Sequence, residues 1–311
     1  MVREPRQLAM RVSLGASVFM LAGKLLAYFL THSTAMFADA AESVVHGVAT
    51  GFAAFSLWYA ARPADTEHPY GHGRIVYFST GFEGALVLAA SVTVMRSGVL
   101  GLMHEPPLER IGLGLAIAGV LAAFNCVLGA TLVRIGRRHN ALVLVANGKH
   151  VLSDFWTTAA AIVGLLLVKL TGHTWLDPLA ALLIGAWIMF TGISLIRTSI
   201  AGLMDQLDPE LATKVEAGLS DAVRRGRIAN YHEVRCRRLN DEIFIDAHLL
   251  VPGETQLDEA HHRATEVENT LQALFPDQRV HIVTHVEPLA HDAAHPKGHP
   301  HRLDEAPAGA R

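Results

Sequence analysis

The chain has 311 residues, of which 51% are hydrophobic and only 18% are charged. Soluble globular domains carry roughly a quarter charged residues, so this composition argues against an ordinary soluble protein. The formal net charge of -3 at pH 7 argues against a nucleic-acid partner. The two cysteines have no CxxC spacing, and they therefore indicate neither a disulfide framework nor a thiolate metal site.

Six apolar segments follow one another along the first two-thirds of the chain. Each is long enough to cross a bilayer core of about 30 Å, which takes roughly 20 mostly apolar residues as a helix. The segments are Leu8–Leu30, Ala35–Tyr59, Tyr77–Met103, Ile111–Val133, Ala141–Leu170 and Leu176–Leu203. A large soluble helical core is the alternative, which six such segments in series disfavour. We predict a bundle of six transmembrane helices within residues 1–207.

The distribution of basic residues predicts the orientation of these helices. Arginines precede the first segment and follow the fourth, whereas the loops on the other side are poor in lysine and arginine. Because basic loops stay in the cytoplasm, we expect both termini there. The residues are Arg3, Arg6, Arg11, Arg134, Arg137 and Arg138.

Two of the segments carry polar residues at the same spacing of three residues and then four. Residues three and four apart share one face of a helix, so each triplet forms a polar stripe, and the two stripes can meet across the bundle. The triplets are Asp39, Glu42 and His46 in the second segment and Asn147, His150 and Asp154 in the fifth. Ionisable groups in a span usually face the bundle interior or a cavity. Taken singly, any of them could instead make an interhelical hydrogen bond.

The stripes contain two imidazoles and two carboxylates, which together can form a tetrahedral nitrogen–oxygen site. Zn²⁺ accepts this set well, and Mn²⁺, Fe²⁺, Co²⁺ and Cd²⁺ accept it in varying degree. The four residues are Glu42, His46, His150 and Asp154. Metal binding must displace protons from such ligands, so the site is suited to exchange of metal for protons. The sequence shows no catalytic triad, and we expect no enzymatic activity. It also shows no nucleotide-binding loop, so transport must be driven by an ion gradient or by the substrate's own gradient.

The last third of the chain is polar and predicts a small α+β domain over residues 208–290. Helical spacing indicates helices at Pro209–Arg224 and Leu257–Leu274, and alternation indicates strands at Glu233–Leu239, Ile243–Val251 and Val280–Val286. The order helix–strand–strand–helix–strand is typical of an open-faced domain.

Residues 291–311 are rich in histidine, proline and alanine, and this composition predicts a disordered tail. Its histidines could capture cytosolic metal weakly or bind it adventitiously. They are His291, His295, His299 and His301.

The pair His150–Asp154 in NGKHVLSD resembles the fifth-span motif of the cation diffusion facilitator family, in particular its bacterial zinc and iron exporters. The second span departs from the family pattern, because Glu42–His46 in ADAAESVVH replaces a His–Asp or Asp–Asp pair. The resemblance implies a transport site at these four residues. It makes Asp39 and Asn147 supporting residues or alternative ligands.

The loop DTEHPYGHGR after the second span resembles the family's HP[FY]GHG signature. The resemblance implies a second metal site at Asp65, His68 and His72; local hydrogen bonding of the histidines is the alternative. It also implies an ion pair between Arg74 and Asp205, which follows the last span.

In the α+β domain, the resemblance implies a ferredoxin-like fold and metal binding at a dimer interface. The implied ligands are His232, His248, His261, His285 and Glu287. His262 and His281 could substitute for some of them, and a merely histidine-rich surface is the alternative.

The resemblance extends from about Arg6 to Pro288. It implies a homodimeric integral membrane protein, expected in the bacterial inner membrane, that exports a divalent metal from the cytoplasm by proton antiport. Zn²⁺ is the leading substrate, and Fe²⁺, Mn²⁺, Co²⁺ and Cd²⁺ are alternatives. A membrane metal sensor that does not transport remains open. An intramembrane metalloenzyme is disfavoured, because no separate general base is visible.

Overall fold

A computed structural model describes residues 18–104, 108–138, 142–239 and 242–290. At positions 46, 50, 136, 142–147, 149 and 150 it describes the backbone alone. The chain divides into two compact units. One contains residues 1–58 and 77–199, and the other contains residues 59–76 and 200–311.

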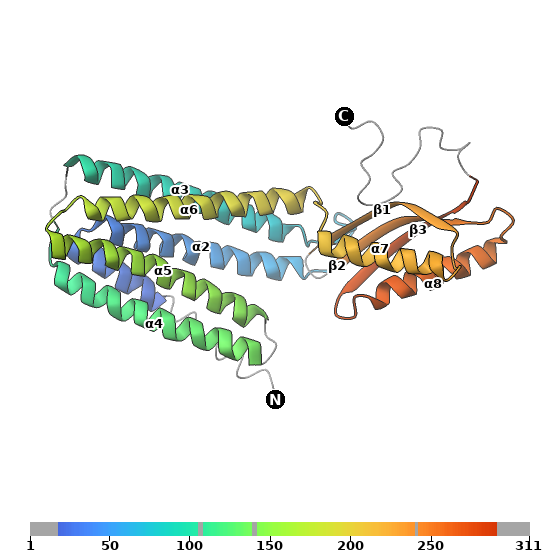
Figure 1. The fold of residues 1–311 in the computed structure, drawn as a ribbon, viewed down its shortest axis with the longest axis horizontal. Helices are drawn as coiled ribbons and strands as arrows, with labels where there is room; N and C mark the ends of the chain where they lie inside the picture. The colour runs from blue at the N-terminus through green and yellow to red at the C-terminus, as the bar shows by residue number, and fades with distance from the viewer. Residues whose placement is uncertain (1–17, 105–107, 139–141, 240–241, 291–311) are drawn as a thin grey trace. The chain divides into compact units, whose positions relative to one another are not determined.

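The first unit is built from long apolar helices (Figure 1). They are the N-terminal helix Val18–Thr31, α2 Thr34–Ala60, α3 Ile75–His104, α4 Ile111–Arg138, α5 Leu142–Thr171 and α6 Leu176–Leu203. Among the described residues, four stretches are long and apolar enough to cross a membrane: Ile75–His104, Ile111–Ile135, Val151–Thr171 and Leu176–Leu203. These confirm four of the six predicted spans. Residues 8–17 of the first predicted segment lie outside the described residues.

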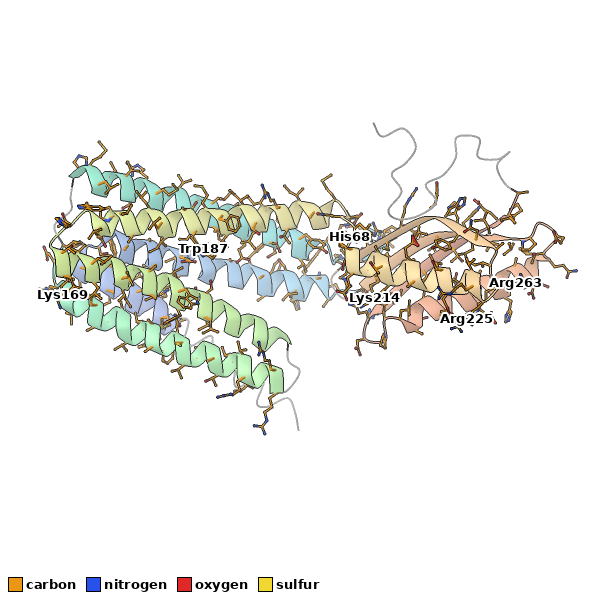
Figure 2. The ribbon with its side chains drawn as sticks, in the orientation of Figure 1. His68, Lys169, Trp187, Lys214, Arg225 and Arg263 are labelled. Atoms are coloured by element: carbon orange, nitrogen blue, oxygen red, sulfur yellow. The ribbon has the colours of Figure 1, made fainter. Side chains whose placement is uncertain are left out.

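Bulky apolar side chains on these helices face outward. Trp156 on α5 is 70% exposed, and on α6 Leu183 is 67% and Trp187 57% exposed; Trp187 is labelled in Figure 2. Large apolar side chains exposed in this way are unfavourable in water, and in a membrane-spanning bundle such side chains contact lipid.

Glycines allow neighbouring helices to approach closely, as is common between membrane helices. A Cβ on Gly148 of α5 would lie 2.7 Å from the backbone nitrogen of Val133 and 2.8 Å from the carbonyl oxygen of Gly129, both on α4. A Cβ on Gly84 of α3 would similarly lie 3.1 Å from the carbonyl oxygen of Gly192 on α6. The α4–α5 and α3–α6 pairs therefore pack backbone against backbone.

The start of α2 is joined to the start of α6 by a buried carboxylate. Asp177 accepts hydrogen bonds from the Ser33 hydroxyl at 2.5 Å and from the Thr34 backbone N–H at 2.7 Å. The carboxylate thus satisfies backbone and hydroxyl donors at the first turn of α2, where a helix has no internal acceptors. Because α5 ends at Thr171, just before α6 begins, α2 and α5 run antiparallel (Figure 1).

The second unit contains a three-stranded mixed sheet with two helices. Its elements are α7 Pro209–Arg224, β1 Asn230–Leu239, β2 Glu242–Val251, α8 Leu257–Ala273 and β3 Arg279–Pro288. The sheet order is β1-β2-β3, with β1 antiparallel and β3 parallel to β2. This confirms the predicted element order. The three strands extend slightly beyond their predicted bounds, because alternation marks the half-buried residues and not the ladder ends.

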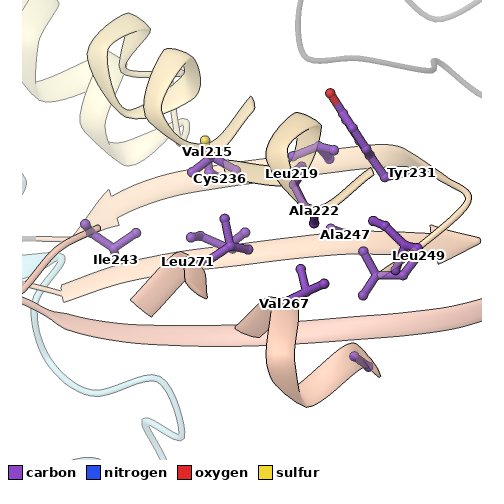
Figure 3. Packing of buried hydrophobic residues seen from close by; sticks show 14 of the residues in the cluster. Val215, Leu219, Ala222, Tyr231, Cys236, Ile243, Ala247, Leu249, Val267 and Leu271 are labelled. Carbon is purple, nitrogen blue, oxygen red and sulfur yellow. The ribbon is translucent and has the colours of Figure 1, made fainter. Parts of the chain in front are cut away.

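The core of this unit lies on one face of the sheet. Ile243, Ile245, Ala247 and Leu249, which alternate along β2, are all 0–1% exposed. Figure 3 shows Ile243, Ala247 and Leu249 together with side chains from both helices, including Leu219 of α7 and Leu271 of α8. The intervening residues of β2, among them Phe244 and His248, therefore point to the opposite face.

Strand β1 contains a β-bulge at Glu233. Two residues, Glu233 and Val234, lie between His232 and Arg235, whereas only one lies between their partners His248 and Asp246. Glu233 has φ of 46°, a left-handed conformation that is uncommon for a side chain other than glycine. The extra residue lets His232 face the open side of the sheet and returns Val234 to the core.

Candidate metal sites

In the helical unit, α2 and α5 meet at Asp39. Its Oδ2 lies 2.9 Å from the hydroxyl of Thr158 on α5, and its Oδ1 lies 3.3 Å from the hydroxyl of Thr157. Glu42 follows Asp39 by three residues on α2, and Asp154 precedes Thr158 by four residues on α5. Because the two helices are antiparallel, Glu42 and Asp154 lie at the same level, one helical turn beyond this contact.

Glu42 and Asp154 are half-buried within this bundle. Position His46 lies four residues after Glu42 on α2, and position His150 lies four residues before Asp154 on α5. Because the helices are antiparallel, both histidine positions lie one further turn away from the Asp39 contact, on the same side of it. The side chains of His46, His150 and Asn147 lie outside the described residues. The backbone therefore brings the two predicted acidic–histidine stripes to matching levels.

A lysine that the sequence interpretation did not use lies beside this region. Lys24, on the N-terminal helix, is 2% exposed, and Asp39 is 1% exposed. The Lys24 ammonium donates to Asp39 Oδ1 at 2.7 Å and to the Ser43 hydroxyl at 2.8 Å. Asp39, predicted as a supporting or alternative ligand, is thus paired with the buried ammonium of Lys24 in this structure.

In the second unit, Asp65, His68 and His72 of the loop come together, with one ligand atom of each within 4.8 Å of the others. Asp65 Oδ1 lies 3.2 Å from His68 Nδ1, and Oδ2 lies 3.4 Å from His72 Nε2. The His72 side chain is 3% exposed. Its Nδ1 is buried without a hydrogen-bond partner among the described residues. The other nitrogen, Nε2, faces Asp65 and is therefore the one placed to bind a metal in this group.

The backbone of the loop donates hydrogen bonds to the Asp65 carboxylate. The backbone N–H groups of His68 and Glu67 donate to Oδ1 at 2.7 and 3.0 Å. The hydrogen bond from the His68 backbone, followed by the His68 ring and the Glu67 backbone, lowers the pKa of Asp65 below its ordinary value. Gly71 has φ of 77°, which lets the chain turn between the two histidines.

Arg74 and Asp205 form an ion pair at 2.6 Å, and Arg237 of β1 joins the same carboxylate oxygen at 2.9 Å. The Arg237 guanidinium also lies 5.7 Å from the ring centroid of Tyr70, which stands in the loop between Asp65 and Arg74, and 5.1 Å from that of Phe244. The loop is thereby tied to the sheet within this unit by charge and by cation–π contacts.

On the open face of the sheet, three histidines align across the strands. His232 pairs with His248, and His248 pairs with His285. Glu287, two residues after His285, points to the same face. Its oxygens lie 3.0 Å from His232 Nε2 and 3.0 Å from His248 Nδ1, and 3.4 Å from His285 Nε2.

Glu287 is 5% exposed. Burial alone would raise its pKa, but the hydrogen bonds and charges of His232 and His248 outweigh burial and lower the pKa. One ligand atom each of His232, His248 and Glu287 lies within 4.8 Å of the others. Two imidazoles and one carboxylate suit Zn²⁺ and leave a fourth position for a further ligand.

The remaining predicted ligands of this domain lie apart from that group. His261 is exposed on α8, which packs against the other face of the sheet. His262 is exposed on the same helix, and His281 stacks on Phe244 near the opposite end of β3. The tail histidines at 291, 295, 299 and 301 lie outside the described residues.

Three contributors were missed from the sequence: Lys24, Glu233 and Arg237. A lysine within an apolar segment is a signal that could have singled out Lys24, since such charges need a partner. Glu233 and Arg237 carry no local signal, because a bulge register and a shared carboxylate depend on residues distant in the chain.

Comparison with known proteins agrees with this architecture. Residues 10–204 match the cation efflux transmembrane domain, and residues 208–289 match the cation efflux protein cytoplasmic domain. The chain belongs to the cation efflux (cation diffusion facilitator) family. It is an integral membrane protein with several transmembrane helices and a transporter that exports divalent metal cations; it is not an enzyme.

Relatives match most of the chain. An uncharacterized transporter of Synechocystis, sll1263, is 35% identical and covers 89% of this chain and 89% of its own. The cation-efflux pump FieF of Shewanella oneidensis is 28% identical over 91% of this chain and 94% of its own. A solved zinc form of the transporter CzrB is 35% identical over 27% of this chain and 90% of its own, with a TM-score of 0.25.

Proposed function

We propose that this protein exports Zn²⁺ from the cytoplasm in exchange for protons, through a site formed by Glu42, His46, His150 and Asp154. In this proposal the N-terminal helix and α2 are the two further membrane spans, and both termini are cytoplasmic. The membrane is the inner membrane of a bacterium. Residues 1–207 form the transport domain, and residues 208–290 form a cytoplasmic domain that binds metal and pairs two chains.

One observation carries the proposal. The contact between Asp39 and Thr158 at 2.9 Å sets the level of α2 against α5. Glu42 and Asp154 then follow at matching levels inside a cation efflux domain, with a histidine position one turn beyond each. Carboxylates and imidazoles at one level of a bundle supply the nitrogen–oxygen donors that Zn²⁺ prefers.

The same donors explain proton exchange. A divalent ion binds deprotonated carboxylates and neutral imidazoles, so a metal arriving from the cytoplasm displaces protons from these groups. Protons from the other side of the membrane reverse the competition and release the metal. Neither step needs a nucleotide, and the driving force is the proton gradient.

The loop and sheet sites lie in the second unit, and we assign them to cytosolic metal. The Asp65–His68–His72 group would hold cytosolic metal in the loop that follows α2 in the chain. The His232–His248–Glu287 group would bind metal on the open sheet face, where a second chain can pair. Metal bound there tightens the homodimer and links its stability to the cytosolic metal load.

The test is metal flux into proteoliposomes under an imposed pH gradient, comparing Zn²⁺, Fe²⁺, Mn²⁺, Co²⁺ and Cd²⁺. The wild-type chain is expected to move Zn²⁺ with counterflow of protons, and Asp154→Ala is expected to lose flux, because the site loses one of its two carboxylates. Ser153→Ala is the matched control, since Ser153 is the exposed neighbour of Asp154 on the same helix.

The outcomes separate the alternatives. Flux of a different metal would support the proposed mechanism and would indicate that Glu42 and His46 select that metal. Equal flux in Asp154→Ala and wild type would remove the proposed site. Binding without flux of any metal would make the protein a membrane metal sensor.

A further inference from the structure

Lys24 is a buried cation in a hydrogen-bonded group that joins three helices. It donates to Asp39 at 2.7 Å and to Ser43 at 2.8 Å, both on α2. Asp39 in turn meets the hydroxyls of Thr158 at 2.9 Å and Thr157 at 3.3 Å on α5. The N-terminal helix, α2 and α5 are thus joined by one hydrogen-bonded polar group at the level just before Glu42 and Asp154.

This arrangement is costly for a structural contact alone. An ammonium and a carboxylate that are 2% and 1% exposed lose nearly all of their hydration, and the attraction within such a pair often only offsets that loss. Ionisable residues within membrane bundles usually belong to the ion path. The cost is explained if the charge of Lys24 acts on the transported ion.

The charges of the region support this explanation. Glu42 and Asp154 also act electrostatically on the Lys24 ammonium. With all groups ionised, three carboxylates and one ammonium leave a net charge of minus two, which a single divalent cation neutralises. In a bundle of low dielectric, the charges of a metal-bound site cost least to enclose when they sum to zero. A neutral metal-bound state is therefore the one that most easily closes off from one side of the membrane and opens to the other.

We propose that Lys24 is a selectivity and positioning residue of transport: it retains Asp39 in an ion pair, leaves Glu42 and Asp154 to the metal, and sets the charge of the region to that which one divalent cation neutralises. The inference rests on the proposed function. Removing Lys24 leaves a third carboxylate without its cation, and the metal then binds more tightly and leaves more slowly. Removing the Asp39 charge leaves an unpaired ammonium that repels the metal.

The test compares Lys24→Met, Asp39→Asn, the double variant and Lys24→Arg, in full-length protein in proteoliposomes with Zn²⁺ as the probe. Lys24→Met is expected to lower the apparent KM for Zn²⁺ at least about tenfold and to reduce maximal flux. Asp39→Asn is expected to raise KM at least about tenfold, since one charge acts on a divalent ion at short range. The double variant restores the net charge, and both it and Lys24→Arg return KM to within about threefold of wild type.

Lys169→Met is the matched control, because it removes a lysine at the far end of α5 (Figure 2), roughly 16 Å along the helix from Thr158. It leaves KM unchanged. A purely structural contact would move KM in the same direction, or not at all, in the two single variants, and that result overturns the inference. If Lys24→Met does not fold, an unchanged KM in Asp39→Asn overturns it equally. Absence of flux in the wild type would instead refute the proposed function.

Discussion

Glu287 contacts three histidines because strand pairing brings their side chains to one place on the sheet. It follows His285 by two residues on β3, and its oxygens lie 3.0 Å from both His232 and His248, which belong to the other strands. Strand register therefore creates this site, since side chains of a row across a sheet are close only when the ladder aligns them. A change at one histidine should act on metal binding more than on the fold.

We predict that His232→Gln lowers the Zn²⁺ stoichiometry of the full-length protein by one ion per chain, because the site loses a buried nitrogen ligand. Equilibrium dialysis at pH 7 measures the stoichiometry. His262→Gln is the control, since His262 is 70% exposed on α8 and outside the group. Equal stoichiometry in wild type and His232→Gln would show that this group does not bind the metal.

At the scale of elements, the position of α5 depends on its contact with α4. Gly129 and Gly148 allow the two backbones to touch, and a Cβ at Gly148 would meet backbone atoms, which cannot move aside as a flexible side chain does. Gly148 is two residues before His150 and six before Asp154. A shift of α5 at this crossing therefore displaces both positions relative to α2.

We expect Gly148→Ala to reduce Zn²⁺ flux at least about tenfold, because displacement of a ligand by about 1 Å is enough to impair a preorganised site. Gly119→Ala on α4 is the control, since nothing lies within 4 Å of the added Cβ. Proteoliposome flux, normalised to the amount of reconstituted protein, measures the effect. Wild-type flux in Gly148→Ala would show that the α4–α5 crossing tolerates a methyl group without moving the site.

At the scale of the whole molecule, the proposed transport site and the proposed cytosolic metal sites belong to different units of one chain. The second unit carries both the Asp65–His68–His72 loop and the sheet site, and Arg237 connects the loop to the sheet by contacting Tyr70 and Asp205. In the proposed function, cytosolic metal therefore acts on one compact unit. Its proposed effect on the dimer can be measured independently of transport.

We predict that Zn²⁺ strengthens dimerisation of the detergent-solubilised protein, because a ligand that binds the paired state preferentially shifts the equilibrium toward it. Light scattering on dilution should show twice the 33.6 kDa of one chain persisting to at least about tenfold lower protein concentration with Zn²⁺ than with a chelator. His232→Gln should remove the difference. A monomer at every concentration with Zn²⁺ present would contradict the proposed dimer.

The sequence by itself determined the features that depend on local spacing. Apolar length predicted the membrane helices, of which four are confirmed, and alternation predicted the strand Ile243–Val251, which is confirmed within β2. Helical spacing predicted the stripes that contain Glu42 and Asp154, and their role in transport remains a proposal. Each of these signals needs only neighbours three, four or two residues apart.

Only the tertiary structure decided which distant groups meet. The Lys24–Asp39 pair, the bulge at Glu233 and the row from His232 to His285 depend on the packing of helices and on strand register. Neither packing nor register follows from the spacing within one segment, because each is set by the free energy of burying many side chains together. The sequence shows Lys24 as a lone lysine in an apolar segment. Its proposed role beside the ion path follows from the Asp39 carboxylate, which only the folded structure places against it.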